Sequence, residues 1–252
     1  MNILITNDDG IYGKGIIELA AKLNDSKHQI VLVAPDRERS AAGHSITLHK
    51  PLRVKRVNMD RLNNILCYKI NGTPADCVKI GLEKLMKNGT DFIISGINNG
   101  PNLGIDVLYS GTVSAAMEGF ILGYKSIAVS LVTDTNRNFQ GAAEKIDELL
   151  TKIKNEKLSK KMLLNINIPD KNNLKNTEIK VTSLGKSIYK DYFTERVDPL
   201  GNKYYWLTGK RERETNKNTD IWAIDNNYIS ITPIKLKLTD SKLAKNLNDI
   251  IN

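Results

Sequence analysis

The sequence predicts an open, mostly parallel α/β sheet with helices on both faces. Short, uninterrupted apolar runs recur along the chain, and such runs are typical of parallel strands that are buried on both sides. The first run, residues 3–6, begins almost at the first residue, and apolar residues at helical spacing follow over residues 16–23. A second run at residues 29–34 completes a strand-helix-strand unit, the building block of parallel sheets.

The same patterns place the remaining elements. Helix-start signals come together at Thr73, Pro74 and Asp76, because threonine caps, proline suits the first helical position and an acidic residue favours the positive end of the helix dipole. Residues 52–58 and 66–70 form two shorter strands, which we expect to make an antiparallel excursion. We expect further strands at residues 92–95, 127–131, 162–168 and 228–234, and helices at 74–86, after 111, at 139–153 and at 241–251.

Three regions follow from this order. Residues 1–183 form the core, residues 184–227 form a hairpin extension, and residues 228–252 return to the core as a strand and a closing helix. The extension contains an Asp-Pro-Leu-Gly turn at residues 198–201, and a lone hairpin cannot bury both of its faces, so we expect it to pack on another subunit. Several aromatic residues lie in and around this hairpin, namely Tyr189, Tyr192, Phe193, Tyr204, Tyr205 and Trp206.

Composition narrows the functional classes. The 252 residues suffice for one large domain with an extension, and the net charge of +9 comes from scattered lysines and arginines, which argues against nucleic acid as the physiological partner. Cys67 and Cys77 have no metal-binding spacing and are expected to be reduced, buried thiols. With no signal-peptide pattern and no run of about 18 apolar residues, we expect a soluble, cytoplasmic protein without a membrane segment.

Two adjacent carboxylates, Asp8 and Asp9, follow the first strand and precede Gly10. An Asp-Asp-Gly sequence is common in ordinary turns, and that interpretation stays open. However, two carboxylates about 4 Å apart repel by about 4 kcal/mol at an effective dielectric constant of about 20, so a partly buried pair needs a proton or a cation. The nearest basic residue in sequence is Lys14.

Other oxygen donors are expected at the same edge, because parallel strands bring their carboxyl ends together there. Ser40 follows the second strand, and Asn98 and Asn99 follow the third buried one. Carboxylate, hydroxyl and amide oxygens suit Mg²⁺ or Mn²⁺, whereas zinc prefers histidine or cysteine. His44 lies in the edge loop, where an ordinary surface role is favoured over substrate contact.

The loop before the helix at Gly111 suits an anion. Helix N-termini expose N–H groups, here on Gly111 and Thr112, next to the hydroxyls of Ser110 and Thr112. Ordinary capping explains these residues equally well when they are taken alone. Together with the carboxylate pair at the same edge, they favour phosphate binding.

Five segments resemble the SurE family of survival-protein nucleotidases in order and spacing, from Met1 to about Asp240. The resemblance implies a Rossmann-like core, oligomerisation into dimers or tetramers through the extension and closing helix, and one divalent cation per subunit. It implies a metal-dependent phosphatase, or 5′-nucleotidase, acting on nucleoside 5′- and 3′-monophosphates and on short polyphosphate. The segments are NDDG, RERSAAGHSITL, GTPADCVKIGL, SGINNGPNLGIDVLYSGTVSAAMEG and YISITP.

The family's functional residues match this sequence position by position, although the 184–225 hairpin varies. The implied metal ligands are Asp8, Asp9, Ser40 and Asn98, with Asp8, Asp9 and Asn98 catalytic, and the implied phosphate contacts are Asn102, Ser110, Gly111 and Thr112. Whether water or Asp8 attacks first stays open. A dinucleotide-binding oxidoreductase is an alternative, but the first turn lacks GxGxxG. A second alternative is a basic, non-enzymatic protein that binds nucleic acid, which the net charge of +9 suggests.

Overall fold

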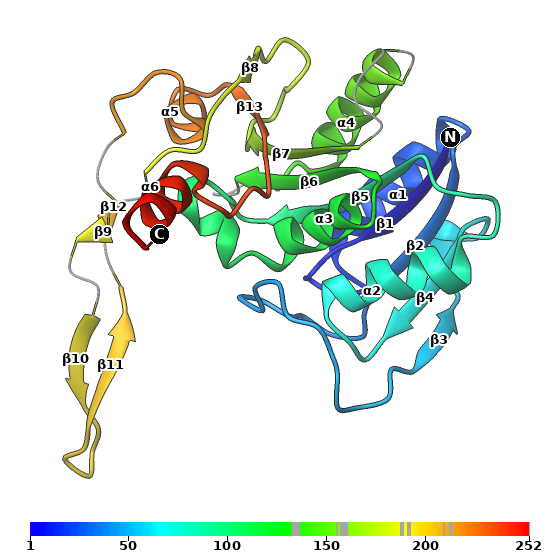
Figure 1. Cartoon of the computed structure of the whole chain (residues 1–252). Helices are drawn as coiled ribbons and strands as arrows, with labels where there is room; N and C mark the ends of the chain where they lie inside the picture. The colour runs from blue at the N-terminus through cyan, green and yellow to red at the C-terminus, as the bar shows by residue number, and fades with distance from the viewer. Residues whose placement is uncertain are drawn as a thin grey trace.

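A computed structural model describes residues 1–132, 137–154, 156, 161–186, 189–190, 193–208, 210–211 and 214–251. Within these ranges, nine strands form one sheet in the order β3-β4-β2-β1-β5-β6-β7-β13-β8 (Figure 1). In chain order they are β1 (Asn2–Thr6), β2 (Gln29–Pro35), β3 (Val54–Val57), β4 (Leu66–Ile70), β5 (Phe92–Asn99), β6 (Lys125–Val132), β7 (Met162–Pro169), β8 (Ile179–Val181) and β13 (Ile229–Pro233).

The central six strands, β4-β2-β1-β5-β6-β7, are all parallel. Numbered along the core alone, they have the order 3-2-1-4-5-6 of a Rossmann fold, which confirms the predicted fold class. The order of the strands reverses at β1, because β2 and β4 lie on one side of it and β5, β6 and β7 lie on the other. Ligands bind at such a switch point in open α/β sheets. The expected antiparallel excursion is the β3–β4 pair, although β4 itself runs parallel to β2.

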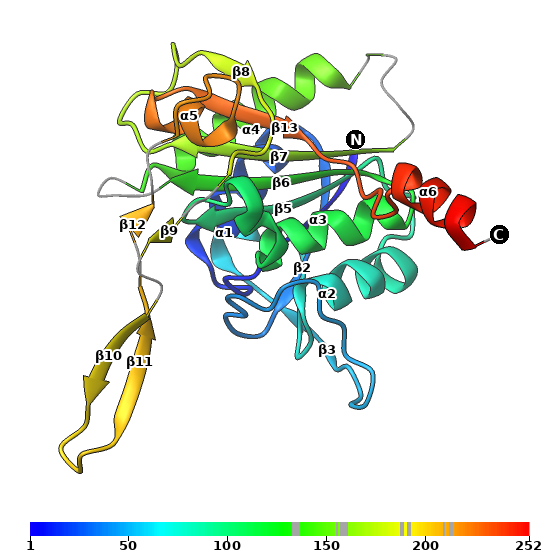
Figure 2. The ribbon, with the colours of Figure 1, turned by 60° about the vertical axis from the view of Figure 1, so that its left-hand side comes forward.

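Helices cover both faces of the sheet (Figures 1 and 2). Alternate residues of β1 point to opposite faces, so Ile3 and Ile5 pack with helices α1 (Lys14–Asp25) and α4 (Phe139–Ile153), whereas Leu4 packs with α2 (Pro74–Ile80) and α3 (Gly111–Ile121). The helix predicted at 74–86 is α2 followed by a short π-helical turn, Gly81–Leu85. Cys67 and Cys77 are buried and form no disulfide, as expected.

A separate hairpin, β10 (Phe193–Val197) paired with β11 (Lys203–Leu207), extends away from the sheet in both views (Figures 1 and 2). Every residue of its two strands is exposed. Between hairpin and core lies the two-residue pair β9 (Tyr189–Lys190) and β12 (Lys210–Arg211). The aromatic residue Tyr192 falls outside the described residues.

Two helices complete the chain. The closing helix α6 (Ser241–Ile251) has the predicted bounds and buries no residue, so Leu243, Leu247 and Ile250 remain exposed. A short helix that we did not predict, α5 (Asp220–Asp225), lies within the extension's sequence range. Ile221 and Ile224 of α5 pack on Leu103, so this part of the extension joins the loop after β5.

Candidate active site

The loop after β1 is shaped by its own side chains. Asn7 donates from Nδ2 to the Gly10 carbonyl oxygen at 2.9 Å and accepts at Oδ1 from the Gly10 N–H at 3.2 Å. Gly10 has a φ of +92°, and a side chain there would meet the backbone of Arg37 at 3.0 Å. This closed turn places Asp8 and Asp9 at the switch point between β1 and β5.

Both carboxylates are electrostatically unfavourable in the folded protein. Burial raises the pKa of Asp8, against the opposing effect of hydrogen bonds from Thr112. Burial together with the charge of Asp8 raises the pKa of Asp9 to about 6. A bound cation would relieve both effects, so the paired carboxylates and their oxygen-rich surroundings fit a hard divalent cation.

Asp8 also contacts the start of α3. The Thr112 hydroxyl donates to Oδ1 of Asp8, and the Thr112 backbone N–H also bonds to this carboxylate. A side chain on Gly111 would lie 2.8 Å from Cβ and Oδ2 of Asp8, so the close approach requires glycine. The Ser110 hydroxyl accepts from the Val113 N–H at 3.1 Å, which is ordinary capping. The predicted anion cradle and the predicted carboxylate pair are therefore in direct contact.

The third buried strand extends further than expected, so that Asn98 and Asn99 are its last two residues. The pairing of β5 with β6 shifts register between Ser95 and Asn98, a bulge that redirects the strand end. The Asn99 N–H then bonds to the Asp9 carboxylate, and Asn98 donates from Nδ2 to the Gly100 carbonyl oxygen at 2.9 Å.

Ser40 reaches this edge by a backbone link. The N–H of Arg39 donates to the carbonyl oxygen of Asp8 at 2.7 Å. The exposed Ser40 hydroxyl donates to the Glu38 carboxylate, whose charge also raises the pKa values of Asp8 and Asp9. We did not predict a role for Glu38 from the sequence. Its position could have indicated one, because an acidic residue two positions before the candidate ligand Ser40 can lie close to a bound cation.

Asn102 is buried beside the carboxyl ends of β6 and β7. Its Nδ2 donates to the Ser130 hydroxyl at 2.8 Å. Asn165 and Asn167 bond to its backbone. We did not predict roles for these two asparagines, although asparagine in a buried strand is a signal, because burying an amide is costly without hydrogen bonds.

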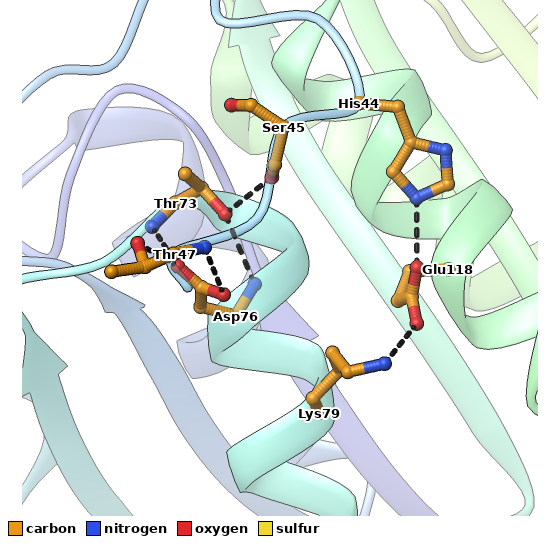
Figure 3. A network of polar contacts seen from close by, with 7 residues as sticks. All are labelled: His44, Ser45, Thr47, Thr73, Asp76, Lys79 and Glu118. Carbon is orange, nitrogen blue, oxygen red and sulfur yellow. Dashed lines mark hydrogen bonds and ion pairs between the residues drawn. The ribbon is translucent and has the colours of Figure 1, made fainter. Parts of the chain in front are cut away.

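The loop after β2 is fixed to two helices (Figure 3). His44 pairs through Nε2 with Glu118 of α3 at 2.8 Å, and the other carboxylate oxygen of Glu118 accepts from Lys79 of α2 at 2.9 Å. Thr47 donates from its N–H and hydroxyl to Asp76 of α2, at 3.1 and 2.6 Å. His44 therefore anchors the loop, a role that its sequence position did not indicate.

The described residues lack both a cluster of the usual metal-ligating side chains and a membrane-spanning helix. No three His, Cys, Asp or Glu side chains among them form a group that could hold a metal ion. A cation at this edge would therefore have to combine the carboxylates with neutral oxygens. No helix in the described part of the chain is long and apolar enough to cross a membrane.

The fold and site define an open α/β protein with an oxygen-rich ligand site at its topological switch point. The model of the family described as Survival protein SurE matches residues 3–191, and this chain belongs to the SurE family.

Proteins of known name are similar to this chain over nearly its full length. The chain is 48% identical over 248 residues to the 5′-nucleotidase SurE of Caldanaerobacter subterraneus subsp. tengcongensis, covering 98% of this chain and 96% of that protein. It is 49% identical over 253 residues to the 5′-nucleotidase SurE of Pelotomaculum thermopropionicum, covering 100% and 95%. The crystal structure of the SurE protein from Aquifex aeolicus superimposes with a TM-score of 0.88 at 38% identity, covering 100% of both chains.

Proposed function

We propose that this protein is a metal-dependent phosphatase that hydrolyses nucleoside 5′-monophosphates to nucleoside and phosphate. The observation that carries the proposal is the direct contact of Asp8, one of the paired carboxylates, with the N-terminus of α3. This arrangement joins an oxygen site for a cation to N–H donors for an anion. The names of the relatives support a nucleotidase and favour it over an oxidoreductase or a nucleic-acid-binding protein.

In this proposal the chain supplies two sets of ligands. Mg²⁺ or Mn²⁺, one per subunit, is held by Asp8, Asp9, Ser40 and Asn98, and the chemistry it supplies when bound is charge neutralisation and polarisation of the phosphate. The phosphate oxygens are bound by Asn102, Ser110, Gly111 and Thr112. Thr112 has a second task, because its hydroxyl holds Asp8 in place. Phosphoryl transfer requires mainly positioning and charge neutralisation, which these residues provide.

The attacking oxygen belongs either to water or to the Asp8 carboxylate. Attack by Asp8 forms an aspartyl-phosphate and releases the nucleoside, and water then hydrolyses the acyl phosphate to restore Asp8. Rapid quenching followed by mass spectrometry of the peptide that contains Asp8 distinguishes the two routes. A phosphorylated Asp8 supports the covalent route.

We extend the proposal to 3′-monophosphates and short polyphosphate, to the cytoplasm as location, and to a homodimer or homotetramer. Two free, buried thiols fit a reducing compartment. The fully exposed strands of the β10–β11 hairpin and the exposed apolar residues of α6 offer surfaces for subunit contact.

The central experiment is a panel of 5′- and 3′-mononucleotides and polyphosphate assayed with Mg²⁺, Mn²⁺ or EDTA. Asp8→Asn and Asp9→Asn should each lower kcat by at least about 10³-fold without unfolding the protein, because each removes a charge that holds the cation. Asp147→Asn is the matched control, since Asp147 pairs with Lys22 and Ser26 away from this site. Full activity in EDTA, or near wild-type activity of either site variant, would refute the metal assignment.

A further inference from the structure

Three polar side chains stand side by side in otherwise apolar, buried strands. Ser130 of β6 is paired in register with Asn167 of β7, and Asn165 lies two residues before Asn167 on the same face of the sheet. All three residues are fully buried. Buried amides and hydroxyls lower stability unless they are hydrogen-bonded, so their partners indicate why they are there.

All three side chains bond to Asn102. Asn167 accepts at Oδ1 from the Asn102 N–H at 2.9 Å and donates from Nδ2 to the Asn102 carbonyl oxygen at 2.9 Å. Asn165 donates to the same carbonyl oxygen at 2.8 Å. Ser130 accepts from Nδ2 of Asn102 at 2.8 Å. The Asn167 side chain therefore bonds to both the N–H and the carbonyl oxygen of Asn102, as the backbone of a neighbouring strand would.

A second anchor lies two residues further along the loop. The buried carboxylate of Asp220 accepts from the Gly104 N–H and the Gly185 N–H, both at 2.8 Å. The loop between β5 and α3 is therefore fixed at Asn102 from the sheet and at Gly104 from α5. An amide nitrogen carries two hydrogens, so donation to Ser130 leaves the second for a ligand oxygen.

We propose that Asn167 is a positioning residue that, with Asn165 and Ser130, orients Asn102 toward the phosphate of the substrate. This inference rests on the proposed function, because it assigns Asn102 to phosphate binding. The position of the Asn102 side chain, and with it the affinity for phosphate, then depends on residues of β6 and β7 that do not touch the ligand. A shift of about 1 Å in such a group can cost about 10²-fold in rate.

The decisive variant is Asn167→Asp, which keeps the side-chain shape and the acceptor but sets a carboxylate oxygen against the Asn102 carbonyl oxygen. We expect the inhibition constant of inorganic phosphate and the KM for AMP to rise about tenfold, which corresponds to about 1.4 kcal/mol. Mn²⁺ affinity, measured by titration without substrate, should stay at the wild-type value, because the cation ligands are elsewhere. Ser130→Ala is a milder second variant, with a smaller expected rise.

Ser26→Ala is the matched control. The Ser26 hydroxyl donates to the Asp147 carboxylate at 2.8 Å, and Ser26 lies between α1 and the start of β2, at the edge of the sheet opposite the carboxyl ends of the strands. This control should lower the melting temperature while leaving the phosphate inhibition constant unchanged. If the control weakens phosphate binding as much as Asn167→Asp does, the effect is general destabilisation and the inference is wrong.

A double-mutant cycle with Asn102→Ala separates this inference from the proposed function. If Asn167 acts through the Asn102 side chain, Asn167→Asp should add little to the effect of Asn102→Ala. If Asn102→Ala weakens phosphate binding and Asn167→Asp does not, the positioning role is refuted and the proposed function stands. If the wild-type protein neither hydrolyses AMP nor binds phosphate, the proposed function fails, and this inference fails with it.

Discussion

At the scale of single residues, the site depends on one carboxylate with two tasks. Asp8 accepts hydrogen bonds from Thr112 at the start of α3 and is also the nearest negative charge to Asp9. The helix end therefore offsets part of the effect of burial on Asp8, while burial and the charge of Asp8 both raise the pKa of Asp9. A bound cation should therefore favour the charged form of Asp9.

The raised pKa of Asp9 predicts a pH-dependent stability. Its ordinary pKa is 3.8 and its pKa in the fold is about 6, so the folded state holds the proton more tightly than the unfolded chain. The free energy of unfolding should therefore fall as the pH rises from about 4 to about 6 and stay lower above that range. In EDTA at pH 7.5, Asp9→Asn should melt at a higher temperature than the wild type, and the difference should disappear near pH 4.

Thermal unfolding of both proteins across this pH range tests the prediction. Adding Mn²⁺ should stabilise the wild type at pH 7.5 and much less at pH 5, where Asp9 is mostly protonated. An Asp9→Asn protein that is less stable than the wild type at pH 7.5 would show that Asp9 is already compensated within the fold.

At the scale of elements, the loop after β2 connects the two helices on one face of the sheet to the site. Arg39 bonds to Asp8 at one end of the loop, and Glu118 and Asp76 hold His44 and Thr47 at the other (Figure 3). Glu118 is buried and contacts both His44 and Lys79, so it is the central connection.

Glu118→Gln should loosen this loop. The variant keeps the side-chain shape but removes the charge that holds His44 and Lys79. We expect trypsin to cleave the loop, at Arg37, Arg39 or Lys50, about fivefold faster, the ratio that corresponds to about 1 kcal/mol. Glu83→Gln is the matched control, because Glu83 forms an exposed pair with the neighbouring Lys84 and holds no part of this loop. Equal cleavage rates in both variants would argue against anchoring by Glu118.

At the scale of the whole molecule, the extension gives a prediction about assembly. Phe193, Tyr205 and Trp206 are 66%, 58% and 61% exposed, which is unusual for aromatic side chains on a free surface. Trp206→Ser combined with Tyr205→Ser should shift the protein toward monomer in light scattering after size-exclusion chromatography. Leu238→Ser is the control, since Leu238 is also highly exposed but lies outside the hairpin. Unchanged mass of the hairpin variant would exclude this surface from the subunit contact.

Local patterns predicted most of the sheet and its helices. The helices at 139–153 and 241–251 have the predicted bounds, because their periodicity lies within the segments and their capping residues, Asn138 and Asp240, directly precede them. By contrast, α5 was missed, since six residues give too short a periodic pattern and its burial depends on Leu103 far away in sequence. The π-helical turn after α2 was not predicted either, because its five residues are too few to show a period different from that of the α-helix.

The fold class, the family and the edge of the sheet that carries Asp8, Asp9, Asn98 and Gly111 could all be read from the amino-acid sequence, because strand polarity brings all carboxyl ends to one side. Which groups touch at that edge could be read only from the folded chain. It paired Thr112 with Asp8, His44 with Glu118 and Asn167 with Asn102, contacts between residues at least 65 positions apart. Such contacts depend on packing and register in three dimensions, on which local propensity carries no information.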